Sequence, residues 1–245
     1  MTSERATPRI ALRQFAVRYP SFILSPLSLE IQPGERVALV GPNGSGKSTT
    51  LMALAGRLPD YEGFILLDGR DLRSMLPLGR RAIGLLPEAL SGYGWMTVRE
   101  HLTFLGEFYP AWDTEYARHL ADRLSVPLDT PLGRLSKGTR VKASFIAAEA
   151  YRPPLLLLDE PTSGLDPAVR GELLGAILSS VDSQSDRVVV FSTHLLEDVE
   201  FVANRVLLLT NGTLELDATV SDILAAHRGA SLARILYAAL SPRTS

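Results

Sequence analysis

Cysteine and long apolar runs are both absent from the 245-residue chain. Without cysteine, neither a disulfide framework nor a thiolate metal site is possible, which is compatible with the cytosol. No run of about 18 apolar residues occurs, so we expect no segment to span a bilayer. The first residues, Met1–Pro8, lack the apolar core of a secretory signal. If the chain works at a membrane, another chain must supply the membrane part.

A strong charge excess is also missing, since the net charge is −2. Bulk electrostatic binding to nucleic acid or to anionic lipid is therefore not indicated. Hydrophobic residues make up 46% and charged residues 21%, which is ordinary for a soluble globular protein. The length allows one large α/β domain, with or without an inserted subdomain.

A glycine-rich loop, Gly41–Thr49, follows the apolar run Arg36–Val40 and precedes the helical pattern Thr50–Ala55. This order of strand, loop and helix is the context in which G-x-x-x-x-G-K-[ST] marks a phosphate site. Glycines let successive backbone N–H groups point inward, and the helix N-terminus adds partial positive charge. The residues predicted to bind the nucleotide here are Asn43, Gly44, Ser45, Gly46, Lys47, Ser48 and Thr49.

Two residues of this loop have specific predicted roles. Lys47 can bridge the β- and γ-phosphates, and the Ser48 hydroxyl can bind Mg²⁺. The loop therefore predicts that the protein binds a nucleoside triphosphate.

Two carboxylates, Asp159 and Glu160, follow the fully apolar run Leu155–Leu158. In open α/β sheets ligands bind beyond the carboxyl ends of strands. Asp159 can hold Mg²⁺ there, and Glu160 can orient or deprotonate an attacking water, which favours hydrolysis over binding alone. A second apolar strand, Val188–Phe191, is followed by His194. Parallel strands would bring His194 to the same edge, where it could contact the γ-phosphate or the attacking water.

Alternating strand and helix patterns predict an α/β fold with a mostly parallel sheet and covering helices. Residues 9–40 have the pattern of short strands, and 88–150 have helical periodicity, with Asp113 as an expected N-cap. We therefore expect a domain over 1–225 with a helical subdomain at about 88–150. Residues 226–245 form an expected short helical tail.

Together these motifs resemble the ATPase subunits of ATP-binding cassette (ABC) transporters over nearly the whole chain. Gly41–Thr49 matches the family's Walker A motif and Leu155–Glu160 its Walker B motif. Pro161–Asp166 matches the D-loop and Ser192–His194 the switch histidine. The resemblance implies a P-loop NTPase core with an N-terminal antiparallel β subdomain and an inserted α-helical subdomain. It also implies ATP and Mg²⁺ as cofactors.

Tyr19 matches the family's aromatic residue that stacks on adenine, and an aromatic face suits a purine ring. Alone, Tyr19 could equally be a strand-edge aromatic. The segment Trp95–Leu102 resembles the one that opens the family's helical subdomain. Tyr93 and Trp95 are candidates for a coupling surface; the alternative is that they pack the subdomain.

The signature motif, usually Leu-Ser-Gly-Gly-Gln, reads Leu135–Thr139 here, with Lys137 and Thr139 at the altered positions. In the family this motif contacts the γ-phosphate held by the opposite copy. The resemblance thus implies nucleotide contacts for Ser136, Lys137 and Gly138. The alternative is a helix-capping turn without a role in another copy.

The second departure is Glu88, at the position where the family has a glutamine. A carboxylate is a good Mg²⁺ ligand, so Glu88 joins Ser48 and Asp159 as a candidate metal ligand. The alternative is a solvent-facing loop glutamate.

The resemblance implies an ATP-hydrolysing subunit in which two copies sandwich two ATP molecules. The partner is another ABC ATPase subunit, in a homodimer or a heterodimer, and a separate transmembrane permease. The expected place is the cytoplasmic face of the membrane, and no nucleic acid is expected. The Leu-Ser-Lys-Gly form of the signature is similar to that of bacterial exporter-like ATPases. Alternatives are a soluble regulatory ABC ATPase and an impaired ATP-binding partner in a heterodimer.

Overall fold

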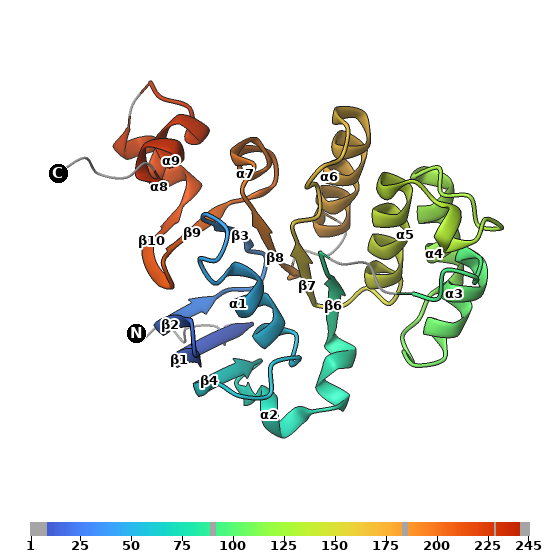
Figure 1. Ribbon diagram of the computed structural model, residues 1–245, viewed down its shortest axis with the longest axis horizontal. Helices are drawn as coiled ribbons and strands as arrows, with labels where there is room; N and C mark the ends of the chain where they lie inside the picture. The colour runs from blue at the N-terminus through green and yellow to red at the C-terminus, as the bar shows by residue number, and fades with distance from the viewer. Residues whose placement is uncertain (1–8, 89–91, 183–185, 228, 241–245) are drawn as a thin grey trace, which may run out of the picture.

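A larger sheet with the strand order β10-β9-β3-β8-β7-β6 forms the centre of the protein (Figure 1). The computed structural model describes residues 9–88, 92–182, 186–227 and 229–240. The strands of this sheet are β3 (Arg36–Val40), β6 (Ile83–Leu86), β7 (Leu155–Asp159), β8 (Val188–Thr193), β9 (Arg205–Thr210) and β10 (Thr213–Thr219). β10 pairs antiparallel with β9, and the other neighbours pair in parallel. The prediction of a mostly parallel sheet is confirmed.

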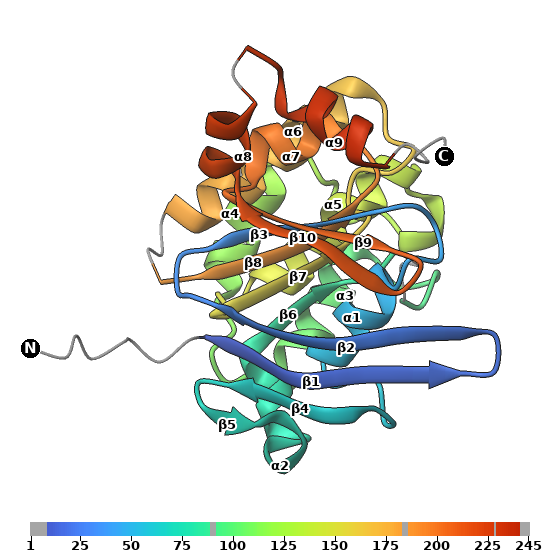
Figure 2. The same ribbon diagram turned by 90° about the vertical axis from the view of Figure 1, so that its left-hand side faces the viewer.

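A smaller antiparallel sheet has the order β2-β1-β4-β5 and lies below the larger one in Figure 2. Its strands are β1 (Ile10–Tyr19), β2 (Phe22–Ile31), β4 (Glu62–Leu67) and β5 (Arg70–Asp71). The sequence pattern over residues 9–40 predicts short strands, but β1 and β2 have ten residues each. The register of β1 shifts between Leu12 and Phe15, where Gln14 has a φ of 50°. Such a bulge inserts an extra residue and breaks the two-residue alternation by which strands are recognised.

The central strands are buried on both faces, and their alternating side chains divide the core into two clusters. In β7, Leu155 and Leu157 pack with the antiparallel sheet and α1 (Lys47–Leu54). Leu156 and Leu158 point to the other face and pack with the covering helices. A fully apolar strand is therefore required here, because neither face meets water.

The remaining helices lie between the strands along the chain. They are α2 (Leu72–Met75), α3 (Val98–Gly106), α4 (Thr114–Arg123), α5 (Lys137–Glu149), α6 (Pro167–Asp182), α7 (Leu196–Val202), α8 (Val220–Ala226) and α9 (Leu232–Leu240), with 3₁₀ turns η1 (Leu78–Ala82) and η2 (Leu132–Arg134). Within the part of the chain that the structure describes, no helix is both long and apolar enough to cross a membrane.

Helices α3, α4 and α5 form the expected insertion between β6 and β7, at one end of the molecule (Figure 1). Asp113 caps α4 as predicted, accepting a hydrogen bond from the Tyr116 amide at 2.8 Å. α3 ends at Gly106, and Glu107 is its C-cap. A Cβ added at Gly106 would lie 3.0 Å from Trp112 Cδ1, so the end of α3 packs closely against this ring.

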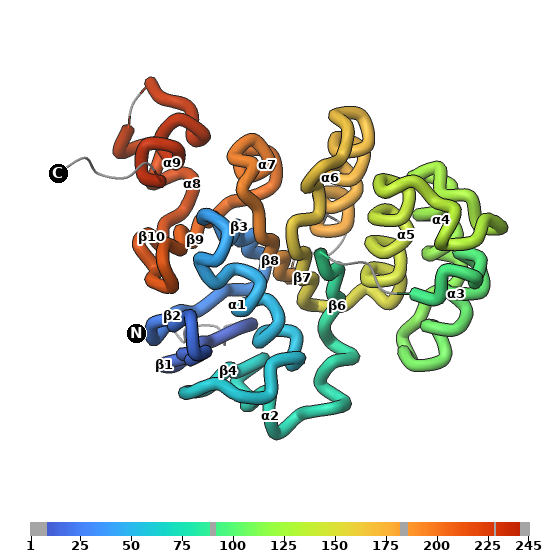
Figure 3. The backbone as a smooth tube through the Cα atoms, viewed as in Figure 1, coloured from blue at the N-terminus to red at the C-terminus, as the bar shows by residue number. Residues whose placement is uncertain are grey.

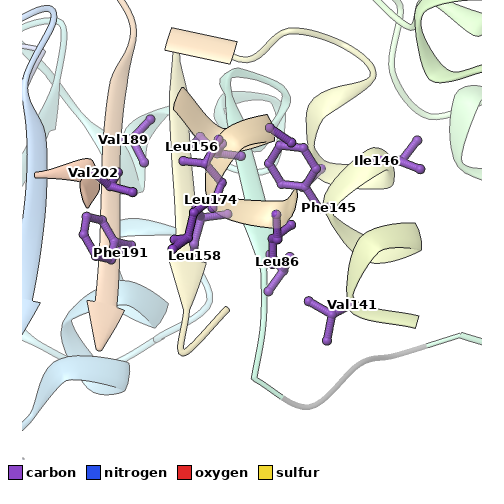
Figure 4. Close-up of a cluster of buried hydrophobic side chains, with 14 of the residues drawn as sticks. Leu86, Val141, Phe145, Ile146, Leu156, Leu158, Leu174, Val189, Phe191 and Val202 are labelled. Atoms are coloured by element: carbon purple, nitrogen blue, oxygen red, sulfur yellow. The ribbon is translucent and has the colours of Figure 1, made fainter. Parts of the chain in front are cut away.

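One aromatic side chain fixes the insertion to the sheet. Phe145 of α5 is fully buried and points toward Leu86, Leu156 and Leu158 of β6 and β7 (Figure 4). Burial of a phenylalanine side chain stabilises such a contact by about 1.5–3 kcal/mol. The start of α5 is thereby held near the carboxyl edge of the sheet.

The expected C-terminal tail, residues 226–245, contains α9, which follows α8 along the path traced in Figure 3. Leu232 and Leu236 of α9 are buried in the same cluster as Val199 and Val202 of α7. α9 is therefore packed into the main core and does not extend away from it.

Candidate functional site

The glycine-rich loop lies between β3 and α1, as predicted, and its glycines meet specific steric demands. Gly46 is the N-cap of α1 with a φ of 106°, a conformation that residues with a Cβ rarely adopt. At Gly41, an added Cβ would lie 2.1 Å from the Leu209 carbonyl oxygen. Neighbouring strand β9 therefore leaves room only for glycine at this position.

A cavity of about 620 Å³ opens over this loop. Its lining residues are Ser21, Phe22, Asn43, Gly44, Gly46, Lys47, Ser48, Thr49, Glu88, Glu160, Ser163 and His194. Most of the side chains predicted from the sequence are thus brought together here. Ser45 is buried within the loop, and Asp159 lies directly behind Ser48.

The Lys47 ammonium is almost fully buried and lies at the mouth of the loop. It donates hydrogen bonds to the carbonyl oxygens of Gly41 at 2.8 Å and Pro42 at 3.2 Å. Glu160 Oε1 lies 3.6 Å away and supplies the opposite charge. A buried charge requires such partners, since desolvation alone would be costly. Lys47 is therefore held where it can meet the phosphates of a nucleotide.

The oxygen donors predicted for Mg²⁺ lie beside Lys47. The Ser48 hydroxyl donates to Asp159 Oδ1 at 3.0 Å, and Glu88 lines the same cavity. Among the described residues no group of three or more His, Cys, Asp and Glu side chains is placed to hold a metal. Mg²⁺ usually takes one or two carboxylates together with water and phosphate oxygens, so a hydroxyl and a carboxylate in contact fit it.

Glu160 and His194 meet at the carboxyl edge of the sheet, as their strand positions predicted. His194 Nδ1 and Glu160 Oε2 are 2.8 Å apart, because β7 and β8 pair in parallel with Asp159 opposite Ser192. The Glu160 carboxylate is nearly buried, whereas the His194 side chain is about half exposed, at 9% and 47%. A carboxylate placed in this way can accept a proton from a bound water.

Ser192 links the Asp159 carboxylate to the backbone of Glu160, a role that its position in the Ser192–His194 motif did not reveal. Its hydroxyl donates to Asp159 Oδ1 at 2.6 Å and accepts from the Glu160 amide at 2.8 Å. The sequence analysis also missed Ser21, Phe22 and Ser163, which line the cavity. Ser21 and Phe22, at the β1–β2 turn and the start of β2, belong to no motif, whereas Ser163 lies in the Pro161–Asp166 motif, which indicated its place but not its contact with the cavity.

Asp198, in α7, is a second residue that the sequence did not single out. Its buried carboxylate accepts from the Thr162 hydroxyl and from Arg170 Nε, the latter at 2.6 Å. Asp198 therefore holds the turn that follows Glu160.

Several predicted site residues lie outside the cavity lining. Tyr19 ends β1, pairs with Phe22 across the hairpin, and has 42% of its surface exposed. Ser136, Lys137 and Gly138 lie at the start of α5 and do not line the cavity either. Ser136 is the N-cap of α5, and its hydroxyl accepts from the Thr139 amide at 3.1 Å.

Tyr93 and Trp95 are exposed, at 57% and 70%, and their ring centroids are 5.7 Å apart. The pair therefore lies on the surface, and its role in a coupling surface stays a prediction. Glu88 is exposed to solvent and also lines the cavity, and its role as a metal ligand stays a prediction.

Comparisons with known proteins agree with this geometry. The family described as "ABC transporter" matches residues 24–163. The chain is 34% identical over 202 residues to the uncharacterized ABC transporter ATP-binding protein YxlF of Bacillus subtilis, covering 80% of this chain and 66% of that protein. It is 37% identical over 188 residues to the thiamine import ATP-binding protein ThiQ of Cereibacter sphaeroides, covering 74% and 80%. The chain thus spans just under two thirds of YxlF.

A solved structure titled "Structure of ATP binding subunit of ABC transporter" superposes with a TM-score of 0.82 at 29% identity. The superposition covers 94% of this chain and 98% of that one. The fold as a whole, and not the phosphate loop alone, is shared with that subunit. The sequence match, the fold and the site together show that the chain belongs to the ABC transporter family as an ATP-binding subunit.

Proposed function

We propose that this chain binds and hydrolyses ATP with Mg²⁺ and that two copies power a transporter whose membrane part is a separate permease. One observation carries the proposal of hydrolysis: the Glu160 carboxylate lies between His194, at 2.8 Å, and Lys47, at 3.6 Å. A site that only binds nucleotide has no need for a carboxylate between a phosphate-binding lysine and a histidine.

Each residue has a chemical role in this proposal. Lys47 and the loop amides bind the β- and γ-phosphates, and Glu160 accepts a proton from the attacking water. His194 orients that water or the γ-phosphate through its ring nitrogens. Ser48 and Asp159 would hold Mg²⁺, with Glu88 as an additional oxygen donor. When bound, Mg²⁺ neutralises negative charge on the phosphate oxygens.

The adenine base is assigned to the rim of the cavity. Tyr19 and Phe22 face each other across the β1–β2 hairpin, and Phe22 lines the cavity. We assign the stacking role to Tyr19, whose exposed ring is available to a purine.

The second half of each ATP site is assigned to another copy. Ser136, Lys137 and Gly138 lie outside the cavity of their own chain and at the N-terminus of α5, where backbone amides can bind an anion. The site is then complete only in a head-to-tail pair of subunits, either two copies of this chain or this chain with a related one.

The permease is assigned to a groove between the core and the helical insertion. A cavity of about 150 Å³ lies there, and Leu85, Leu105, Tyr109 and Tyr151 contribute to its lining together with Arg57 and Arg80. The exposed pair Tyr93 and Trp95 precedes α3, which also lines this groove. A cytoplasmic segment of a membrane subunit would place the chain at the cytoplasmic face of the membrane.

Export is the proposed direction of transport, on the ground of the Leu135–Gly138 form of the signature. The relative ThiQ is named for thiamine import, so a transport assay with the co-purified permease decides the direction. Accumulation of a substrate inside right-side-out vesicles would contradict export.

Replacing the predicted general base tests the proposal of hydrolysis. In Glu160→Gln we expect ATP binding to persist and ATP turnover to fall by about 100-fold or more, because the amide cannot accept the proton. A phosphate-release assay measures turnover, and Glu115→Gln is the control because it alters an exposed carboxylate on α4. Turnover equal to that of the wild type would show that Glu160 is not the base.

The same variant tests the dimer. Blocked hydrolysis should trap the ATP-bound pair, so light scattering of Glu160→Gln with ATP and Mg²⁺ should give twice the monomer mass. A monomer at saturating ATP would count against the sandwich.

A further inference from the structure

Lys137 is the residue by which the signature motif departs most from its family pattern, and its ammonium has a defined partner in its own chain. Nζ donates to the Ser163 carbonyl oxygen at 2.7 Å. A Cβ added at Gly164 would lie 2.7 Å from the same Nζ, so the lysine covers the turn Thr162–Gly164 closely. That turn follows the predicted base Glu160, and Ser163 lines the ATP cavity.

The opposite side of the turn is held by α7. Asp198 accepts from the Thr162 hydroxyl and is itself anchored by Arg170 of α6. Inside the turn, the Ser163 amide donates to the Glu160 carbonyl and the Leu165 amide to the Thr162 carbonyl, both at 3.2 Å. Lys137 therefore supplies the contact from the helical insertion, and Asp198 supplies the contact from the sheet side.

The start of α5 is packed so that the lysine is aimed at this turn. A Cβ on Gly138 would lie 2.9 Å from Val169 Cγ1, so the first turn of α5 lies directly against α6. A glycine at position 137, as in the usual signature, has no side chain with which to reach the Ser163 carbonyl. The contact is thus specific to the lysine form of the motif.

We propose that Lys137 is a positioning residue that ties the signature helix to the Thr162–Gly164 turn of the same chain. Movement of α5 is thereby transmitted to a residue of the chain's own ATP cavity. The ammonium serves this turn and is not the group that contacts the phosphate of the opposite copy. The consequence for catalysis rests on the proposed function, whereas the contact itself does not.

Amide hydrogen exchange in the full-length chain without nucleotide tests this role. The variants are Lys137→Met, which keeps the length of the side chain, and Lys137→Arg, which keeps a donor. Arg134→Met removes an exposed cation three residues away and serves as the control. Loss of the contact should raise exchange of the Ser163 and Leu165 amides by about fivefold in Lys137→Met, with little change in the other two variants. Equal exchange in Lys137→Met and wild type would overturn the proposal.

Steady-state kinetics separate positioning from phosphate binding. We expect Lys137→Met to lower kcat for ATP while KM changes by less than about twofold, since the ammonium binds no phosphate. A rise in KM with normal exchange in the turn would assign Lys137 to the nucleotide of the opposite copy and overturn the proposal. If no variant and no wild-type sample hydrolysed ATP, the proposed function would fail, and the exchange experiment would still decide the role of Lys137.

Discussion

His101 is a residue whose environment makes a pH dependence of stability predictable. It lies on α3, and its Nδ1 atom is buried without a hydrogen-bond partner among the described residues. Burial lowers the pKa of His101 below its ordinary value of 6.5. The neutral ring is therefore favoured in the folded protein, because the charged form would lose its hydration.

The sign of the effect follows from linkage. Between the lowered pKa of the folded state and the ordinary value near 6.5, the unfolded chain binds more protons than the folded chain, so stability falls as the pH falls. We expect urea denaturation to show a larger loss of unfolding free energy between about pH 7.5 and pH 5.5 in the wild type than in His101→Gln. Parallel pH profiles for the two proteins would show that His101 does not contribute.

The pair Asp159 and Glu160 shows what can be predicted at the residue scale. Their place after a buried apolar strand was sufficient to predict that they meet Ser48 and His194, because parallel strands end at one edge. The role of Ser192 between them could not be predicted. It depends on a hydroxyl rotamer and on the register of β7 against β8, which no local pattern encodes.

At the scale of elements, hydrophobic periodicity and helix-capping residues predicted the structure correctly. Irregularities of the backbone could not be predicted from the sequence. The buried strand β7 and the cap of α4 follow directly from the apolar run and from Asp113. The bulge in β1, where the pairing with β2 shifts between Leu12 and Phe15, depends on contacts between strands. Propensity and periodicity contain no term for such tertiary contacts.

A buried ion pair connects two parts of the fold that are separate in sequence. Arg187, before β8, and Glu149, at the end of α5, are both fully buried, with Nη1 and Oε1 2.7 Å apart. The Tyr116 hydroxyl donates to the same oxygen at 3.0 Å. Burial, followed by the Glu149 charge, raises the pKa of Tyr116 to about 12, so the phenol retains its proton. The helical insertion is thus joined to the core by one charged cluster.

Removing one partner from this cluster should be strongly destabilising. Glu149→Ala would leave the Arg187 guanidinium buried without its counter-charge, at an expected cost of about 3–5 kcal/mol in unfolding free energy. Urea denaturation measures this loss. Glu115→Ala, which breaks an exposed pair with Arg118 on α4, should have a much smaller effect. Similar losses in the two variants would mean that the buried pair has no special importance.

At the scale of the whole molecule, the two halves of the proposed ATP site lie on different parts of the surface. Lys47 lines the cavity, whereas Ser136 at the start of α5 does not. If two copies pair head to tail, each site combines Lys47 of one copy with Ser136 of the other. A twofold symmetric interface of this kind makes a specific prediction for mixtures of variants.

Lys47→Ala and Ser136→Arg should each abolish ATP turnover in a pure sample, the first by removing phosphate binding and the second by blocking the opposite site. In a mixed pair of these two variants, one site contains both defects and the other contains none. An equimolar mixture should therefore recover turnover, to about a quarter of the wild-type rate if subunits pair at random and the intact site works alone. The matched control is Lys47→Ala mixed with the doubly substituted chain, in which no pair contains an intact site, so no recovery is expected. Sites that are complete within one chain would give no recovery in the first mixture, because neither variant contains an intact site by itself.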